Sequence, residues 1–186
     1  MQSTEAYRVV REVVGPWCKV QGFRRTKSAF PGWYKPVTDR FLVFWFQCDK
    51  RGWDNFAGSK FTVEFQLGSE PGIGTMRVGE NRKRLPQFLD NKELEKMREI
   101  QNNVILRLRR PPNNHPALHI SPEISAVYLE KFKPDTKPYK SSDDIWLRYY
   151  TDRDVKRWAE FVLAQLPLIV ARFEVDEDRQ EKTDCL

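Results

Sequence analysis

FLVFWFQC, residues 41–48, and FTVEFQLG, residues 61–68, are the two stretches of sequence that decide the fold. The first is apolar on both faces, which is typical of a strand at the centre of a sheet. The second alternates apolar with polar residues, which is typical of a strand with one covered face. The connections between these segments are short, so we expect antiparallel pairing. A third candidate strand, residues 30–35, contains Pro31 and Gly32 and fits the edge of the sheet better than its centre.

Apolar residues at helical spacing predict three main helices around these strands, over about residues 4–21, 92–109 and 151–173. Pro16 interrupts the first of these segments, so a kink is expected near Gly15. The other two have cap signals at their starts, where an acidic residue or a threonine is followed three residues later by an acidic one.

A shorter helix is expected to begin at Ser121, with Pro122 in its first turn. Its inward-facing side chains should be Ile124, Val127, Tyr128 and Phe132. Taken together, the segments predict a single α+β domain over residues 1–173. Its curved antiparallel sheet of about three to five strands would have the N-terminal, middle and C-terminal helices packed on one face. Residues 174–186 are expected to form a flexible acidic tail.

Charge is distributed unevenly along the 186 residues, whose net charge is +6. Residues 174–186 carry six acidic and two basic residues, so that tail is at −4 and residues 1–173 are at +10. One interpretation of this asymmetry is an anionic partner. The other is that lysines and arginines simply face water.

Composition also bears on location. No apolar run approaches the roughly 20 residues needed to cross a bilayer, and the first residues do not resemble a signal peptide. Cys18, Cys48 and Cys185 are widely spaced, which favours reduced thiols. We therefore expect a cytoplasmic chain with no membrane partner.

Motifs that carry chemistry are incomplete in this chain. The glycine-rich residues 68–79 lack the Lys-Ser or Lys-Thr pair of a phosphate loop and the third glycine of a dinucleotide loop. His115 and His119 have a spacing compatible with metal binding, but Pro116 separates them and no acidic or cysteine cluster lies nearby. We expect no cofactor, no metal site and no catalytic residues, and an enzyme of unknown class is kept only as a second alternative.

Basic and aromatic residues are the most informative surface feature. The candidate binding residues are Arg24, Arg25, Lys27, Trp53, Phe56, Arg77, Arg82, Lys83 and Arg84. Bases interleaved with aromatics suit single-stranded nucleic acid, and Trp and Arg are also enriched at protein interfaces. The structural alternative is that the two aromatic residues fold back onto the sheet edge. RVGENRKR, residues 77–84, is interpreted as a turn with a basic rim in water, or as one part of a larger basic patch.

Several short motifs resemble one family. GPWCKVQGFRRTKSAF, residues 15–30, runs from a helix through a Gly-Phe into basic residues, the two aromatic strands follow, and Arg77-Val78-Gly79 and DDIWLRYYTDRDVKRWAEFVLAQL, residues 143–166, come later. The chain is similar in this to the bacterial domain-of-unknown-function family numbered four-three-zero-four. The resemblance implies a bacterial cytosolic α+β domain and brings no catalytic residues.

The functional hypothesis that follows is a non-catalytic bacterial interaction module. It would bind a protein partner in an accessory, immunity or defence role, because no catalytic constellation accompanies a surface rich in arginine and loop aromatics. The alternative is a nucleic-acid-binding protein that uses the basic and aromatic residues as one patch.

Overall fold

The two aromatic-rich stretches form the central strand pair of the sheet. In the computed structural model, which describes residues 2–73 and 82–183 and side chains through residue 174, β3 (Arg40–Cys48) pairs antiparallel with β4 (Ser59–Gly68). Phe44 lies opposite Phe65 in this register. Both strands are long because aromatic and β-branched residues pack well on a pleated surface.

Six strands make up the sheet in the part of the chain that the structure describes, and every pairing is antiparallel. The other four are β1 (Arg24–Arg25), β2 (Gly32–Val37), β5 (Arg82–Arg84) and β6 (Leu147–Tyr149). The order is β1-β2-β3-β4-β5, and β6 pairs with the other end of β4. The sheet has one strand more than the largest number expected, because β1, β5 and β6 are only two or three residues long. β2 lies inside the sheet and β1 takes the edge expected for it.

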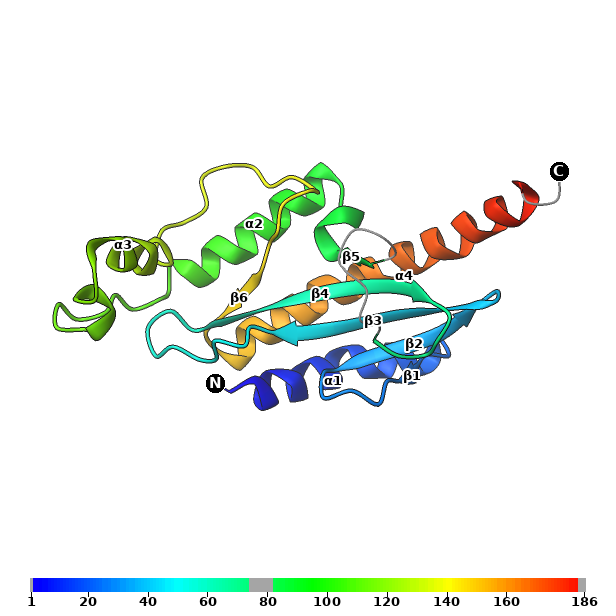
Figure 1. Ribbon diagram of the computed structural model, residues 1–186, viewed down its shortest axis with the longest axis horizontal. Coiled ribbons are helices and arrows are strands. Elements are labelled where there is room, and N and C mark those ends of the chain that lie inside the picture. Colours follow the sequence, from blue (N-terminus) through cyan, green and yellow to red (C-terminus); the bar gives the residue numbers. More distant parts are fainter. Residues whose placement is uncertain (1, 74–81, 184–186) are drawn as a thin grey trace.

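Four α-helices accompany the sheet among the described residues (Figure 1). They are α1 (Ser3–Val20), α2 (Asn91–Ile105), α3 (Pro122–Glu130) and α4 (Asp152–Thr183). The caps follow the sequence signals: Asp90 and Glu93 form a reciprocal capping box on α2, and the Thr151 and Asp154 side chains bond each other's backbone N–H at α4. Pro16 lies inside α1, which continues past it to Val20.

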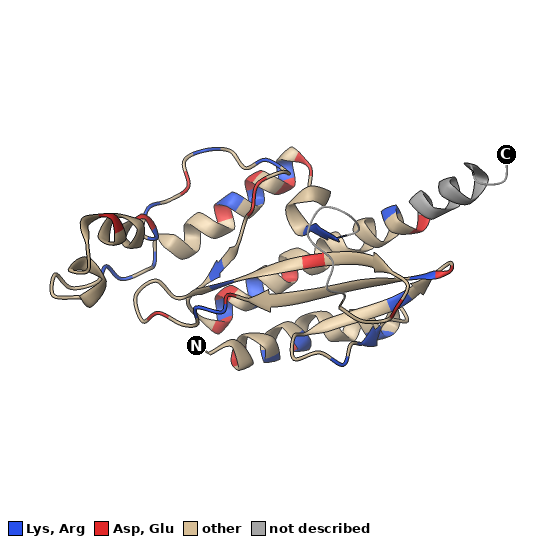
Figure 2. Ribbon diagram, in the orientation of Figure 1, with Lys and Arg blue, Asp and Glu red and all other residues tan. Residues whose placement is uncertain are grey.

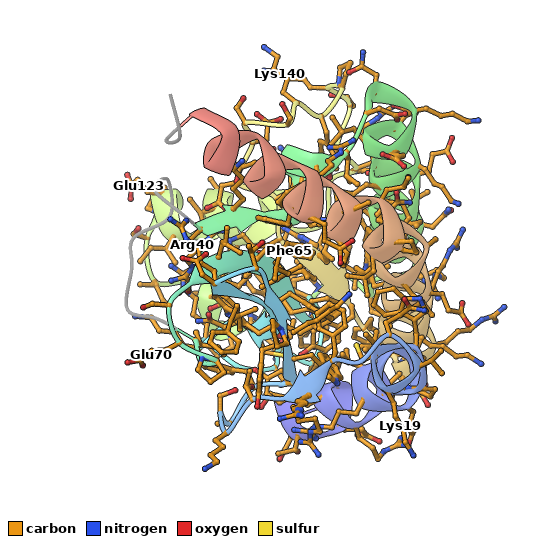
Figure 3. All side chains as sticks on the ribbon, turned by 90° about the vertical axis from the view of Figure 1, so that its right-hand side faces the viewer. Lys19, Arg40, Phe65, Glu70, Glu123 and Lys140 are labelled. Carbon is orange, nitrogen blue, oxygen red and sulfur yellow. The ribbon has the colours of Figure 1, made fainter. Side chains whose placement is uncertain are left out.

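One face of the sheet carries the main core, as the α+β prediction requires. Phe44 and Phe65 are fully buried on this face and stack with ring centroids 5.7 Å apart. Figure 3 shows Phe65 at the centre of the molecule, between the sheet and α4. Buried residues of α1, α2 and α4 belong to the same apolar cluster, so the three main helices cover one face as predicted.

The other face of β4 is also buried, although its alternation indicated a face toward water. Thr62, Glu64 and Gln66 lie on this face and are each less than 5% exposed. The central strands carry little charge in Figure 2, whereas basic and acidic residues gather on helices, loops and strand ends. Glu64 is the exception, and its ion pairs are described below.

The segment that carries α3 extends away from the sheet at the left of Figure 1. We call residues 106–144, between α2 and β6, the α3 arm. The inward face predicted for α3 is wrong at two positions, since Ile124 and Val127 are 45% and 69% exposed while Tyr128 is buried. The reason is that α3 packs on the loop after β3 through Tyr128, and not on the main core.

The last helix, α4, contains Pro167 and runs on to Thr183, so it includes part of the acidic segment expected to be a flexible tail. Its last described side chain, Glu174, forms an ion pair with Lys35 of β2 at 2.9 Å. None of the described helices combines the length and the apolar character needed to cross a bilayer.

Gly58 should be the glycine least tolerant of substitution. It has a positive φ of 69°, and a Cβ there would collide with the backbone carbonyl of Tyr149 on β6. Gly58→Ala should lower the free energy of unfolding by about 2–4 kcal/mol, through a left-handed backbone strain and an overpacked contact. Urea denaturation measures this loss.

Gly52 provides the matched control, because its φ is 78° but the space around its Cβ position is open. Gly52→Ala should cost only about 1 kcal/mol, the backbone strain alone. Equal losses for the two variants would contradict the close approach of residue 58 to β6.

Candidate anion-binding site

The basic residues predicted to form one patch lie at two separate edges of the sheet. Arg24 and Arg25 are exposed on β1, and Lys27 is exposed just after it. Arg82, Lys83 and Arg84 form β5, beyond β2, β3 and β4. Four strand spacings separate the two edges by roughly 19 Å. Arg77 lies outside the described residues.

Two of the three cations on β5 are engaged by a buried carboxylate. Glu64 is 1% exposed and lies directly opposite Arg84 in the β4–β5 register. Arg82 and Arg84 both donate to it, Arg84 through Nε at 3.2 Å, and Arg84 also pairs with Asp144. Lys83 points the other way and is exposed. The basic stretch after the glycine-rich loop therefore serves mainly to neutralise Glu64.

Both predicted aromatic residues pack against other parts of the protein, but only Trp53 does so at the sheet edge, as the structural alternative proposed. Trp53 stacks on Tyr150 with ring centroids 5.3 Å apart. Phe56 packs edge-on against His115, which in turn stacks on Tyr128 at 5.0 Å. His115 thus belongs to an aromatic contact between the loop and the α3 arm.

Beside Trp53, a pocket of about 210 Å³ opens between the loop after β3, the start of β4, the end of α3 and β6. Four cationic side chains line it among the described residues: Arg51, Lys60, Lys131 and Arg148. We call these four the cation cluster. Asp49 and Asp54 are the acidic residues in the lining, so formal charges leave the pocket at +2.

Each member of the cation cluster is positioned by a different part of the fold. Lys60 on β4 and Arg148 on β6 face each other directly in the strand register. Lys131 follows the last residue of α3, and Arg51 lies in the turn after β3. The pocket therefore exists only when the α3 arm and β6 are docked on β4.

Arg148 holds these parts together through its backbone and its guanidinium. Its N–H donates to Gln101 Oε1 at 3.0 Å, and its carbonyl accepts from Trp158 Nε1 at 2.6 Å. Its guanidinium donates to the Lys131 carbonyl at 2.5 Å. Gln101 also donates to the Trp146 carbonyl at 3.0 Å and so replaces a missing strand partner for β6.

The cation cluster is electrostatically unfavourable in the free protein. Burial lowers the pKa of Lys60, and the charges of Arg148 and Arg51 lower it further against the pull of Asp49. The pKa of Lys131 is lowered in the same way, first by burial and then by Arg148, Arg51 and Lys60, with Asp54 opposing. Like charges brought together in this way favour a bound anion, which would relieve their repulsion.

Asp54 neutralises the cluster only in part, because its carboxylate is also used to shape the loop. Its carboxylate accepts from the N–H groups of Phe56 and Ala57 at 2.7 and 2.8 Å and from the Tyr128 hydroxyl at 3.0 Å. Burial alone would raise the pKa of Asp54, but these hydrogen bonds lower it below its ordinary value. The carboxylate is fixed toward its own loop and toward the α3 arm.

Arrangements for other chemistry are not seen in the described residues. There is no group of three or more His, Cys, Asp or Glu side chains placed to hold a metal ion in that part of the chain. His119 contacts the Asn113 carbonyl at 2.7 Å. Burial raises the pKa of the Cys18 and Cys48 thiols, which disfavours the nucleophilic thiolate.

No protein-family model, curated protein or solved structure matches this chain. The resemblance to the domain-of-unknown-function family therefore stays a prediction. The cation cluster itself was missed from the sequence, apart from Trp53 at its edge, because its four members span nearly 100 residues and no local motif links them. The one local signal was DKRGWDNFAGSK, residues 49–60, where Arg51 and Lys60 flank two aromatic residues.

Lys131→Gln should raise the thermal stability of the free protein by roughly 1–2 °C, because it removes a partly buried charge that lies near Arg148, Arg51 and Lys60 and that Asp54 offsets only in part. The folded pKa of Lys131 is below its ordinary value of 10.5, so the unfolded chain binds more protons as pH nears that value. Wild-type stability should therefore rise relative to the variant as pH rises from 7 toward 10.5, and the gain should level off above 10.5, where Lys131 becomes neutral in both states. Melting curves by circular dichroism at pH 7 and pH 10 test both statements.

Lys133→Gln is the matched control two residues away. Lys133 is exposed and pairs with Glu130 at 2.6 Å, outside the pocket. Its loss should not raise the melting temperature. If both lysine variants lowered stability equally, the cation cluster would not be a site of repulsion.

Tyr128→Phe should lower the free energy of unfolding by about 1–2 kcal/mol, since the hydroxyl donates to a carboxylate. The folded pKa of Asp54 is below its ordinary value of 3.8. The stabilisation is therefore present above that value and lost as pH falls through the folded pKa. The difference between wild type and variant should shrink between pH 7 and pH 3 in urea titrations.

Tyr150→Phe separates the charge effect from the loss of a hydroxyl. The Tyr150 hydroxyl donates to the neutral carbonyl of Asn55 at 2.9 Å. Removing this hydroxyl should lower the free energy of unfolding by the same amount at pH 7 and at pH 3. A Tyr128→Phe effect that is also independent of pH would show that Asp54 is not its acceptor.

Proposed function

We propose that this chain is a non-catalytic interaction module that binds an acidic segment of a protein partner at the cation cluster. The observation that carries the proposal is the convergence of Arg51, Lys60, Lys131 and Arg148 on one pocket that its own acids do not neutralise. Holding like charges together costs stability, and a site that tolerates this cost is commonly one that gains it back on binding.

A protein partner suits the surroundings of the pocket better than a nucleic acid does. Ile124 and Val127 are exposed on α3 and lie one to two turns before Lys131 on the same side of the helix. An apolar surface beside cations is typical of the centre and rim of protein interfaces. Trp53 packs on Tyr150 and so presents less of its ring for base stacking.

Nucleic-acid binding is the second candidate, and its support lies at the other end of the sheet. Arg24, Arg25 and Lys27 are exposed at the β1 edge. Three cations within four residues can neutralise phosphates without reading sequence, and such binding weakens steeply with salt. The two candidates therefore use different residues and can be told apart.

The setting that we propose is the bacterial cytoplasm, in an accessory, immunity or defence role. It is supported by the resemblance in the sequence and by the two free, buried cysteines among the described residues, which suit a reducing compartment.

The test is fluorescence anisotropy with a labelled peptide that alternates Glu and Asp with Leu and Ile. A matched peptide with Gln and Asn in place of the acids, and single-stranded oligonucleotides, are measured in parallel. The acidic peptide should bind the wild type, and Lys131→Gln should weaken it by roughly 5-fold or more, the loss of about 1 kcal/mol from one charge pair. Lys133→Gln, which removes the same charge outside the pocket, should change binding by less than about 2-fold.

Equal losses for Lys131→Gln and Lys133→Gln would reject the cation cluster as the binding site. Oligonucleotide binding that survives Lys131→Gln but is lost when Arg24 and Arg25 are both replaced by Gln would favour the second candidate. A photo-crosslinking amino acid in place of Val127 can then capture the natural partner. A captured protein counts as that partner only if Lys131→Gln also reduces its capture.

A further inference from the structure

A second group of cations surrounds a hollow between α1 and β1, far from the cation cluster. Arg11, Gly15 and Lys19 recur at every fourth position of α1 and so lie on one side of the helix. Because Gly15 has no side chain, its Cβ position faces open space, with no atom within 4 Å apart from its two chain neighbours and the nearby backbone of α1. Figure 3 shows Lys19 near the end of α1 that faces the viewer.

The hollow has a volume of about 350 Å³, and Phe23, Arg25 and Trp33 complete its lining. Its floor is aromatic and rigid: the Trp33 ring stacks on Phe44 at 5.4 Å, and Phe23 packs edge-on against Phe44 at 5.5 Å. A volume of this size lies at the lower end of small-molecule pockets, which are mostly apolar with a few polar groups that fix orientation.

Charge at this hollow has one sign. Its described lining contains three cations and no acidic residue. Glu12, the neighbouring acid on α1, instead pairs with Arg8 at 2.6 Å. Arg11 Nε is buried and has no hydrogen-bond partner in the part of the chain that the structure describes. A buried guanidinium N–H without an acceptor is costly.

We infer that the hollow lined by Arg11, Gly15, Lys19, Phe23, Arg25 and Trp33 binds a small aryl anion, a carboxylate or phosphate carried on an aromatic ring. The anionic group would accept from Arg11 and Arg25, since guanidinium forks suit planar or tetrahedral oxyanions. The ring would pack over Phe23 and Trp33 in the space left by Gly15.

This inference does not rest on the proposed protein-binding function. The α1 hollow shares no residue with the cation cluster. A ligand there adds a small-molecule site to the chain, and this site includes Arg25 of β1.

The experiment is titration of the ¹⁵N-labelled full chain with phenyl phosphate, followed by the Gly15 amide and the Trp33 indole resonances in a chloride buffer. Inorganic phosphate and benzyl alcohol test the anion and the ring separately. Phenyl phosphate should shift both resonances, and each of the other probes should bind roughly 10-fold more weakly, because each lacks one half of the contact.

Two variants and one control locate the site. Arg11→Gln should weaken phenyl phosphate by roughly 10-fold, whereas Arg8→Gln removes the same charge one turn away and should leave affinity within about 2-fold. Gly15→Leu fills the hollow without a clash at Cβ, and leucine favours a helix more than glycine does, so binding should be lost while the fold is kept.

Four outcomes would overturn the inference. They are no shift at Gly15 or Trp33 at about 10 mM probe, shifts confined to Trp53 in the other pocket, equal losses for Arg8→Gln and Arg11→Gln, or undiminished binding in a folded Gly15→Leu variant. Loss of acidic-peptide binding in Lys131→Gln with phenyl phosphate binding intact would show that the two sites are separate.

Discussion

Burial of both faces of the β3–β4 pair is the constraint on which the rest of the structure depends. One face packs against three helices and needs only apolar side chains. The other face includes Glu64, whose carboxylate is 1% exposed. An unpaired buried carboxylate would cost several kcal/mol, so the fold must bring cations to it. β5 supplies Arg82 and Arg84, and this requirement explains why the three-residue strand RKR lies beside β4.

This constraint distinguishes two kinds of cation in the structure: those that neutralise a buried carboxylate, and those that exceed the acidic groups around them. Arg82 and Arg84 are balanced by Glu64 and Asp144, and Arg107 is balanced by Asp154 at the start of α4. Such pairs serve the fold and leave little charge for a ligand. The cation cluster differs because Asp54 is held by its own loop and by Tyr128, so four cations face only partial compensation. The distinction rests on the acceptors nearby and not on the number of basic residues in a stretch.

The sequence was sufficient for the class of fold, because the long strands and the helices have local signals, although the short strands β1 and β5 were not predicted and residues 82–84 were interpreted as part of a turn. The alternation in residues 61–68, the stripes of the long helices and the caps at Asp90 and Thr151 all depend on residues within a few positions of each other. The sequence was insufficient to predict packing that depends on contacts between residues far apart in the chain. Nothing near Ile124 in the sequence shows that α3 packs on a loop through Tyr128 alone, and nothing near Glu64 shows that its face is covered. The residues of the site were the hardest to predict. Trp53 lies at the pocket as part of a predicted local stretch, but Lys131 and Arg148 reach the pocket only through the docking of the α3 arm and β6.

The two hollows make different demands on a ligand, and their linings explain why. The cation cluster is bounded by polar loop and strand residues. Lys60 pairs with Asp49, and Arg148 donates to the Lys131 carbonyl. The exposed apolar residues of α3 lie outside the pocket. The cation cluster therefore suits carboxylates presented along an extended segment, with apolar contacts made alongside. The hollow on α1 has an aromatic floor beneath its cations and an arginine N–H without an acceptor. It therefore suits one anionic group attached directly to a ring. Because the first lies at the β6 end of β4 and the second at the β1 edge, the sheet itself keeps the two kinds of ligand apart.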